Sequence, residues 1–270
     1  MRRSGPVQHA VQALGGATLG VLGFVGGAGL LLKESAGLAL RGAWSRTGIA
    51  GRTFRTQAVR SGPRSLPVVM LVNLFVGMIL ALIGGRVLLT LGFKEYVGKL
   101  MGIGMVLELG PLLTAIIMTG YIGAAYTAEI ATTVVSEEIT ALETMALKPS
   151  RLVAAPRILA VTLMVPCVTL VGDVVGIFGG RLVGGAVLEI GTNTYWEQVW
   201  VQLTTENIRD GMIKATVFGL IVGLVGCFKG FRARGGAEGV GRATTSSVVT
   251  AIVAILIADG ILNYLMLFRL

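Results

Sequence analysis

Charged residues are scarce in this sequence, at 14% of 270 residues, where a soluble domain carries roughly 25%. Histidine occurs once, and the two cysteines, Cys167 and Cys227, lie inside apolar stretches without forming a C-x-x-C motif. This composition disfavours a soluble enzyme, a disulfide scaffold and a zinc site. A G-x-x-x-x-G-K-[ST] phosphate loop is also missing, because Gly98-Lys99 is followed by Leu100. We therefore expect a chain that is not an enzyme and holds no cofactor or metal of its own.

Apolar residues are abundant, at 54% of the chain, and the 40 glycines show no collagen-like period. This combination predicts an all-α polytopic membrane protein. The length permits one domain of about five or six spans, since each span takes roughly 20 apolar residues plus a loop. The net charge of +9 does not indicate nucleic-acid binding, because the basic residues are spread between apolar runs instead of clustering on one face.

Five long apolar runs predict transmembrane helices. They cover residues 66–91, 100–135, 158–187, 212–228 and 248–268. The second run is too long for one perpendicular helix, and Gly110-Pro111 lies inside it, which predicts a break near Pro111.

The distribution of Lys and Arg predicts the orientation, because these residues collect in cytoplasmic loops. Residues 1–65 hold nine, 136–157 hold three and 229–245 hold four, against four on the other side. The N-terminus is therefore expected in the cytoplasm and the C-terminus on the periplasmic side. On that side Tyr195, Trp196 and Trp200 are predicted to be interfacial anchors.

The N-terminal stretch 10–32 is uncharged and contains seven glycines. We favour a helix that lies in the cytoplasmic interface. A sixth span remains open, and a signal peptide is a third interpretation. The predicted organisation is an N-terminal interfacial helix and basic cytoplasmic segment over residues 1–65, followed by a five-span membrane domain over 66–270.

Small residues recur every four positions in several spans, which lets helices approach closely in lipid. The clearest ridge is Gly172, Gly176, Gly180 and Gly184. The same pattern occurs at Gly77 with Ala81 and Gly85, at Gly120 with Ala124 and Ala128, at Gly219 with Gly223, and at Gly226 with Gly230.

Six ionisable residues fall within or near the apolar runs, at a cost of at least ~2.5 kcal/mol for each one at a helix centre. They are Glu108, Glu129, Asp173, Arg181, Lys214 and Asp259. Glu129 and Arg181 lie near span ends, which favours a structural role. Asp173 is equally compatible with a structural pair and with a function, whereas Glu108, Lys214 and Asp259 are the stronger functional candidates.

Residues 136–147 predict a short helix outside the membrane. Ser136 is expected to cap it, Glu137 and Glu138 suit its N-terminal end, and Lys148-Pro149 is expected to stop it. Its apolar stripe consists of Ile139, Leu142 and Met145 or Ala146. This stripe either rests on the chain's own spans or enters a groove on a cytoplasmic partner.

Several motifs in one order resemble the MlaE/YrbE permease family, from about residue 40 to the C-terminus. They are E-L-G-P at 108–111, A-E at 128–129, S-E-E-I-T-A-L-E at 136–143, Pro149, P-R-I-L-A at 156–160, G-I-F-G-G at 176–180 and G-G-A-E-G-V-G-R-A-T-T at 235–245. Many members have Arg where Leu107 and Tyr121 stand and Gln where Ile83 stands. These departures favour less charged lipids, because a guanidinium suits phosphate.

The resemblance implies a bacterial inner-membrane permease of an ABC transporter that moves phospholipid or another apolar lipid. It implies a homodimer, a cytoplasmic ATPase that binds ATP and Mg, and a periplasmic MCE-domain partner. The implied ATPase contacts are Glu137, Glu138, Ile139, Leu142, Glu143 and Met145. The implied lipid cavity at the dimer interface involves Leu80, Val87, Leu88, Leu91, Glu108, Lys214 and Asp259.

Three other functions stay open at the level of sequence. An ion-coupled secondary carrier would also use intramembrane carboxylates, although no inverted repeat is detectable. An ABC permease for another hydrophobic substrate fits the same composition, as does a structural subunit without a conduit.

Overall fold

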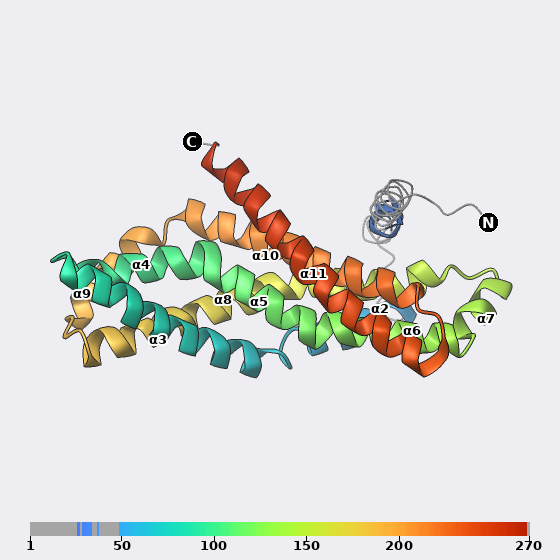
Figure 1. Cartoon of the computed structure of the whole chain (residues 1–270). Coiled ribbons are helices and arrows are strands. Elements are labelled where there is room, and N and C mark those ends of the chain that lie inside the picture. The colour runs from blue at the N-terminus through green and yellow to red at the C-terminus, as the bar shows by residue number, and fades with distance from the viewer. Residues whose placement is uncertain (1–25, 28, 34–36, 38–48, 269–270) are drawn as a thin grey trace, which may run out of the picture.

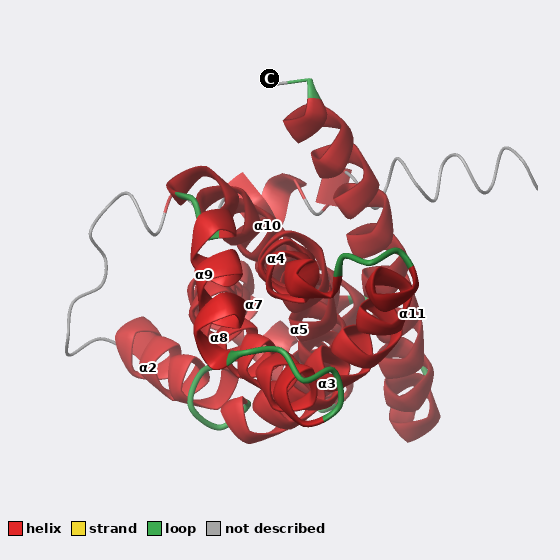
Figure 2. Cartoon of the chain, turned by 90° about the vertical axis from the view of Figure 1, so that its left-hand side faces the viewer, coloured by secondary structure: helices red, strands yellow, loops and turns green. Residues whose placement is uncertain are grey.

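The structure is a computed structural model that describes residues 26, 27, 29–33, 37 and 49–268. Within these residues it is helical and contains no strand (Figures 1 and 2). Five helical stretches are long and apolar enough to cross a membrane: Gly51–Thr90, Lys94–Val135, Ser150–Ala186, Thr205–Phe231 and Gly236–Leu267. The predicted all-α polytopic fold with five spans is confirmed. Most of the predicted interfacial helix over 10–32 lies outside the described residues.

The α-helices are α2 (Ile49–Ser61), α3 (Leu66–Thr90), α4 (Val97–Ile103), α5 (Gly110–Met118), α6 (Ala124–Val135), α7 (Glu138–Thr144), α8 (Ala155–Ala186), α9 (Thr192–Gln202), α10 (Thr205–Phe231) and α11 (Gly236–Leu267). A 3-10 turn, η1 (Lys94–Tyr96), precedes α4. Three π-helical segments are η2 (Gly104–Leu109), η3 (Thr119–Gly123) and η4 (Ser150–Ala154).

Proline marks the starts of α3, α5 and α8, where its missing N–H would have no helical partner in any case. Thr204 is the N-cap residue of α10, and its side chain accepts a hydrogen bond from the backbone N–H of Asn207 at 3.3 Å.

The predicted break near Pro111 is wrong. The chain stays helical from Lys94 to Val135 and widens into the π-helical segments η2 and η3. The backbone N–H of Gly110 bonds to the carbonyl of Met105, five residues back, and Pro111 follows in the first turn of α5. The wider turn therefore takes up the irregularity that proline imposes, without interrupting the span.

Two apolar clusters form the core. One joins α5, α6, α8, α10 and α11 and includes Tyr126, Phe218 and Ile255. The other lies nearer α9 and includes Met101 and Tyr195. In Figure 1, α9 lies at one end of the bundle and α7 at the other, and these are called the α9 end and the α7 end below.

Glycines bring helix backbones into direct contact, as the ridge on α8 predicts. A Cβ atom at Gly77 of α3 would overlap the carbonyl oxygen of Gly176 of α8, and one at Gly179 would overlap that of Leu74. A Cβ at Gly226 of α10 would lie 3.0 Å from the carbonyl oxygen of Gly123. Gly120 differs, since nothing lies within 4 Å of a Cβ there, so it brings no other helix of this chain into close contact.

Of the three predicted interfacial anchors, the prediction is wrong for Tyr195. Its side chain is fully buried, and its hydroxyl donates to the carbonyl oxygen of Ile177 at 2.7 Å, so it fastens α9 to α8. Trp196 is half-buried, whereas Trp200 is 67% exposed.

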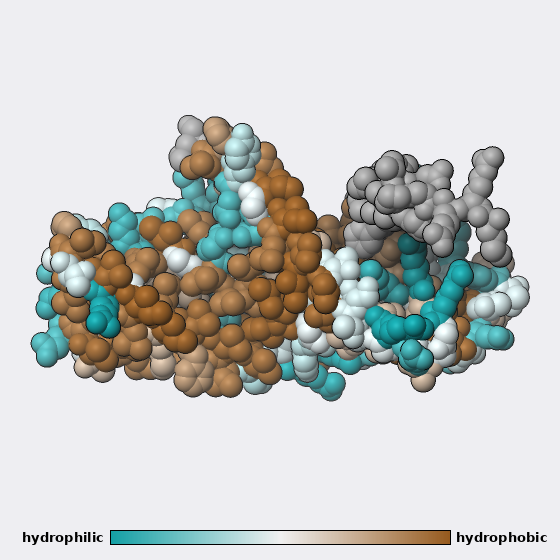
Figure 3. Space-filling view, in the orientation of Figure 1, coloured by the Kyte–Doolittle hydropathy of each residue, from teal (hydrophilic) through white to brown (hydrophobic). Residues whose placement is uncertain are grey.

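The outer surface is apolar over most of its length (Figure 3). Hydrophilic residues gather toward the end that carries α7. On α3 and α11 many large apolar side chains face outward, among them Phe75, Ile83, Val253, Ile257 and Ile261. Figures 1 and 2 show α11 crossing the bundle obliquely, with its C-terminal part standing away from the other helices.

Candidate functional site

The three strongest ionisable candidates meet in one charged cluster on η2, α10 and α11. The ammonium Nζ of Lys214 lies 2.5 Å from Glu108 Oε2 and 3.1 Å from Asp259 Oδ1. It also donates to Asn263 Oδ1 at 2.7 Å. Asn263 Nδ2 in turn donates to Glu108 Oε1 at 3.1 Å. One cation therefore holds two carboxylates and an amide from two other helical segments.

Local backbone features bring these side chains together. Glu108 lies on the π-helical segment η2. Gly211 lies one turn before Lys214, and a Cβ there would overlap the carbonyl oxygen of Val106, so α10 reaches η2 only because this residue is glycine. Asp259 and Asn263 are four residues apart and share one face of α11. Asn263 was missed by the sequence reasoning, although its spacing from Asp259 is a usable signal.

The cluster is closed on one side and open on the other. The side chain of Lys214 is 1% exposed, whereas that of Glu108 is 38% exposed. A buried ammonium requires charged or hydrogen-bonding partners, and here it has three. The carboxylate of Glu108 and the exposed side chain of Asn263 are the parts of the cluster that are accessible from outside the subunit.

Asp173 does not join this cluster. It is buried on α8, and its Oδ1 atom has no hydrogen-bond partner. A Cβ at Gly110 of α5 would overlap that oxygen, so glycine makes room for the carboxyl group. The predicted alternative of a pair with a neighbouring helix finds no ion pair among the described residues.

Glu129 has the structural surroundings that its position near a span end predicts. Its carboxylate pairs with Arg60 of α2 and with Arg157 of α8, the second at 3.1 Å. Arg157 also donates to the carbonyl oxygen of Val153 at 2.8 Å. These contacts tie α2 to α6 and α8 at the α7 end.

The predicted helix over 136–147 forms as α7, but over Glu138–Thr144 only. Ser136 does not cap it, because its backbone ends α6 and its hydroxyl donates back to the carbonyl of Thr133. Glu137 precedes α7 in the left-handed conformation, with φ 60°.

The end of α7 also differs from the prediction. Ala146 has φ 57°, its N–H bonds to the carbonyl of Glu143, and the N–H of Leu147 bonds to that of Leu142. This is a Schellman ending in which alanine occupies the position that usually takes glycine. The helix therefore stops before Lys148-Pro149.

The predicted ATPase-contact residues divide by exposure. Ile139 and Leu142 are half-buried, whereas Met145 is 68% exposed. Glu137, Glu138 and Glu143 are exposed. The exposed residues in and beside α7 therefore include three glutamates and one prominent apolar side chain, Met145.

The four predicted cavity residues of α3 also divide. Val87 and Leu91 are 55% and 62% exposed. Leu80 and Leu88 are half-buried against the core cluster near α9. Only Val87 and Leu91 are thus fully presented to a neighbouring molecule or to lipid.

The described residues contain no group of three His, Cys, Asp or Glu side chains arranged to hold a metal ion.

Comparison with known proteins identifies relatives over most of the chain. The family model for permease MlaE matches residues 54–265. A probable ABC transporter permease protein of Rickettsia typhi is 37% identical over 205 residues, covering 76% of this chain and 79% of the relative. The intermembrane phospholipid transport system permease protein MlaE of Haemophilus influenzae is 34% identical over 206 residues, covering 76% and 79%. The chloroplastic protein TRIGALACTOSYLDIACYLGLYCEROL 1 of Arabidopsis thaliana is 36% identical over 212 residues, covering 78% and 61%.

Proposed function

The chain belongs to the MlaE permease family, and from this we propose that it is the membrane-spanning subunit of an ATP-driven transporter of lipid, with phospholipid as the substrate class. The observation that carries the proposal is the family match over residues 54–265, which includes both the charged cluster and α7. The relative named for intermembrane phospholipid transport supports the choice of substrate.

In this proposal the protein is a homodimer in the bacterial inner membrane, with the N-terminus in the cytoplasm and the C-terminus in the periplasm. A cytoplasmic ATPase binds ATP and Mg, and this subunit catalyses no reaction itself. A periplasmic MCE-domain protein exchanges lipid with the dimer. The hydrophilic α7 end then faces the ATPase, and the α9 end faces the periplasm.

The physical problem that such a subunit solves is the transfer of acyl chains. Extracting a two-chain lipid exposes roughly 30 methylenes at ~0.8 kcal/mol each, or ~25 kcal/mol if all of them met water. An apolar path removes most of this barrier. Val87 and Leu91 supply apolar surface on the outer side of α3, and a second copy placed against that side would enclose them.

The charged cluster suits the mouth of such a cavity. Glu108 is its accessible carboxylate, while Lys214 and Asp259 are buried behind it. Because the cluster joins η2, α10 and α11, a change in the spacing of these segments would alter the accessible charge. We assign it to coupling between lipid and the closure of the cavity.

The coupling to ATP is assigned to the exposed residues in and beside α7. Met145 is 68% exposed and would enter an apolar groove of the ATPase, with Glu137, Glu138 and Glu143 facing basic residues around it. Ile139 and Leu142 would support this surface from below.

One purification tests both assignments. The full chain, expressed in its native host and extracted in mild detergent, is expected to retain a cytoplasmic ATPase and bound phospholipid, both identified by mass spectrometry. Met145→Asp should release the ATPase, whereas Trp200→Asp, at an equally exposed site at the α9 end, should not. A parent protein that transports lipid fully without any ATPase would overturn the proposal.

The cavity is tested by filling it. Val87→Trp should lower the bound lipid per subunit several-fold, because the indole occupies space meant for acyl chains. Val174→Trp is the matched control, since Val174 is 66% exposed on α8. Equal lipid content in the two variants would remove Val87 from the cavity.

A further inference from the structure

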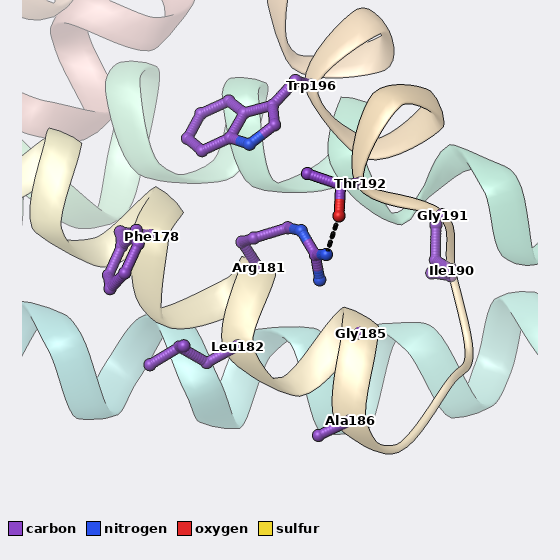
Figure 4. A pocket seen from close by; sticks show the side chains of 9 residues that line it. All are labelled: Phe178, Arg181, Leu182, Gly185, Ala186, Ile190, Gly191, Thr192 and Trp196. Atoms are coloured by element: carbon purple, nitrogen blue, oxygen red, sulfur yellow. Dashed lines mark hydrogen bonds between the residues drawn. The ribbon is translucent and has the colours of Figure 1, made fainter.

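A pocket whose lining includes no residue of the charged cluster or of α3 lies at the α9 end. It has a volume of about 520 Å³ and is formed by the end of α8, the loop that follows and the start of α9 (Figure 4). The residues that matter here are Phe178, Arg181, Leu182, Gly185, Thr192 and Trp196. It shares no residue with the predicted lipid cavity.

The guanidinium group of Arg181 is held in place inside this pocket. It donates a hydrogen bond to the hydroxyl of Thr192, drawn as a dashed line in Figure 4. Its central carbon lies 6.0 Å from the centre of the Tyr195 ring, and that ring is itself fixed by the bond to Ile177. A Cβ at Gly185 would overlap Nη1 of Arg181, so glycine provides the space that the guanidinium occupies.

The charge of Arg181 is not neutralised by a carboxylate. Among the residues that the structure describes, no Asp or Glu oxygen forms an ion pair with it. Three other basic side chains of the helical bundle do form ion pairs with carboxylates, namely Arg60, Arg157 and Lys214. A fixed, planar, unneutralised guanidinium is the group that best recognises phosphate, through two parallel hydrogen bonds.

The side chains around Arg181 are arranged like the parts of a membrane lipid. Apolar side chains lie on one side of the guanidinium, and a tryptophan lies across the pocket from them. Phe178 and Leu182 are 50% and 44% exposed on the outward-facing side of α8. Phe178 lies eight residues before the end of α8 at Ala186, or ~12 Å deeper along the helix axis. Trp196 lies on α9 across the pocket from Phe178 and Leu182 (Figure 4), and tryptophan is a residue typical of the membrane interface.

We propose that this pocket binds a glycerophospholipid from the membrane leaflet at the α9 end, with Arg181 bonded to its phosphate and an acyl chain lying along Phe178 and Leu182. The site goes beyond the proposed function, because it would exist in any membrane protein with this surface and does not depend on the α3 cavity or on an ATPase.

The test is native mass spectrometry of the full chain in detergent, with phosphatidylglycerol, diacylglycerol or inorganic phosphate added separately. The parent should bind phosphatidylglycerol more tightly than diacylglycerol, which has the same tails and no phosphate. Arg181→Gln should weaken phosphatidylglycerol binding by roughly tenfold, since a hydrogen bond to a charged group is lost. Gly185→Ala should weaken it as well without changing the net charge, because the methyl group displaces the guanidinium.

Arg209→Gln is the matched control. Arg209 lies at the same end of the molecule but outside the pocket, and this substitution removes the same positive charge from the protein. Performing the titration in the Val87→Trp background separates this site from lipid in the α3 cavity. Equal affinity of Arg181→Gln and Arg209→Gln would overturn the proposal. So would equal binding of diacylglycerol, and complete displacement of the lipid by inorganic phosphate would assign the site to free phosphate instead.

Discussion

Replacing Lys214 with methionine removes the only cation from the charged cluster and leaves the rest of its volume filled. Two carboxylates, Glu108 and Asp259, then face each other without the ammonium that separates them. At an effective dielectric constant of about 20, the 3.1 Å pair between Lys214 and Asp259 alone has a Coulomb energy of ~5 kcal/mol. Desolvation of the ammonium offsets much of this gain when the pair forms.

The loss on breaking the pair is larger than the pair's net contribution, because an uncompensated charge stays buried. We expect Lys214→Met to lower the free energy of unfolding by ~3–5 kcal/mol. The triple variant Glu108→Gln, Lys214→Met, Asp259→Asn should recover at least half of that loss, since it leaves no charge unpaired.

The assay is unfolding of the purified protein in detergent micelles, followed by circular dichroism, for the parent, the single variants and the triple variant. The difference between the effect of the triple variant and the summed effects of the single variants measures the total coupling energy within the cluster. A Lys214→Met protein as stable as the parent would refute the reasoning, and so would a triple variant no more stable than Lys214→Met.

Two further predictions concern backbone geometry. Gly77→Ala should destabilise the fold by ~2 kcal/mol or more in the same unfolding assay, because its methyl group would overlap the carbonyl of Gly176, whereas Gly120→Ala should be near neutral because nothing lies within 4 Å. Ala146→Gly should stabilise α7 by ~1 kcal/mol, since glycine adopts φ 57° without strain. The stabilisation should appear as slower proteolysis of the 136–149 loop. Ala141→Gly, inside α7, should have the opposite effect.

The five spans were predictable because each is a long apolar run, and the bilayer imposes that composition on any helix that crosses it. Glu108, Lys214 and Asp259 were also predictable as individual candidates, since an ionisable side chain in an apolar run is costly and is therefore a functional candidate. Their convergence was not. It depends on the register of α10 and α11 against η2, and periodicity within one helix does not specify which residues of another helix it meets.

The same limit explains the residues that were misjudged. Tyr195 has the composition of an interfacial anchor, but the carbonyl of Ile177 lies within reach of its hydroxyl and draws it inward. Arg60 and Arg157 belong to segments far apart in sequence, and the packing of α2 against α8 brings both to the carboxylate of Glu129. The π-helical segment η2 depends on how the chain accommodates Pro111, for which a kink and a wider turn are alternative solutions.

The direct backbone contact between α3 and α8 restricts how the subunit can change shape. Where carbonyl oxygens occupy the places of missing side chains, neither helix can slide along the other without first separating, so α3 and α8 must travel as one rigid body. α11 is under no such restriction, because only 17% of its most apolar stretch is buried. Its polar contacts with α10 are those of Asp259 and Asn263 with Lys214 and that of Ser246 with Lys229. Swinging α11 outward therefore removes two of the three partners of the lysine, so the position of that helix and the ion pairing of the cluster are thermodynamically linked.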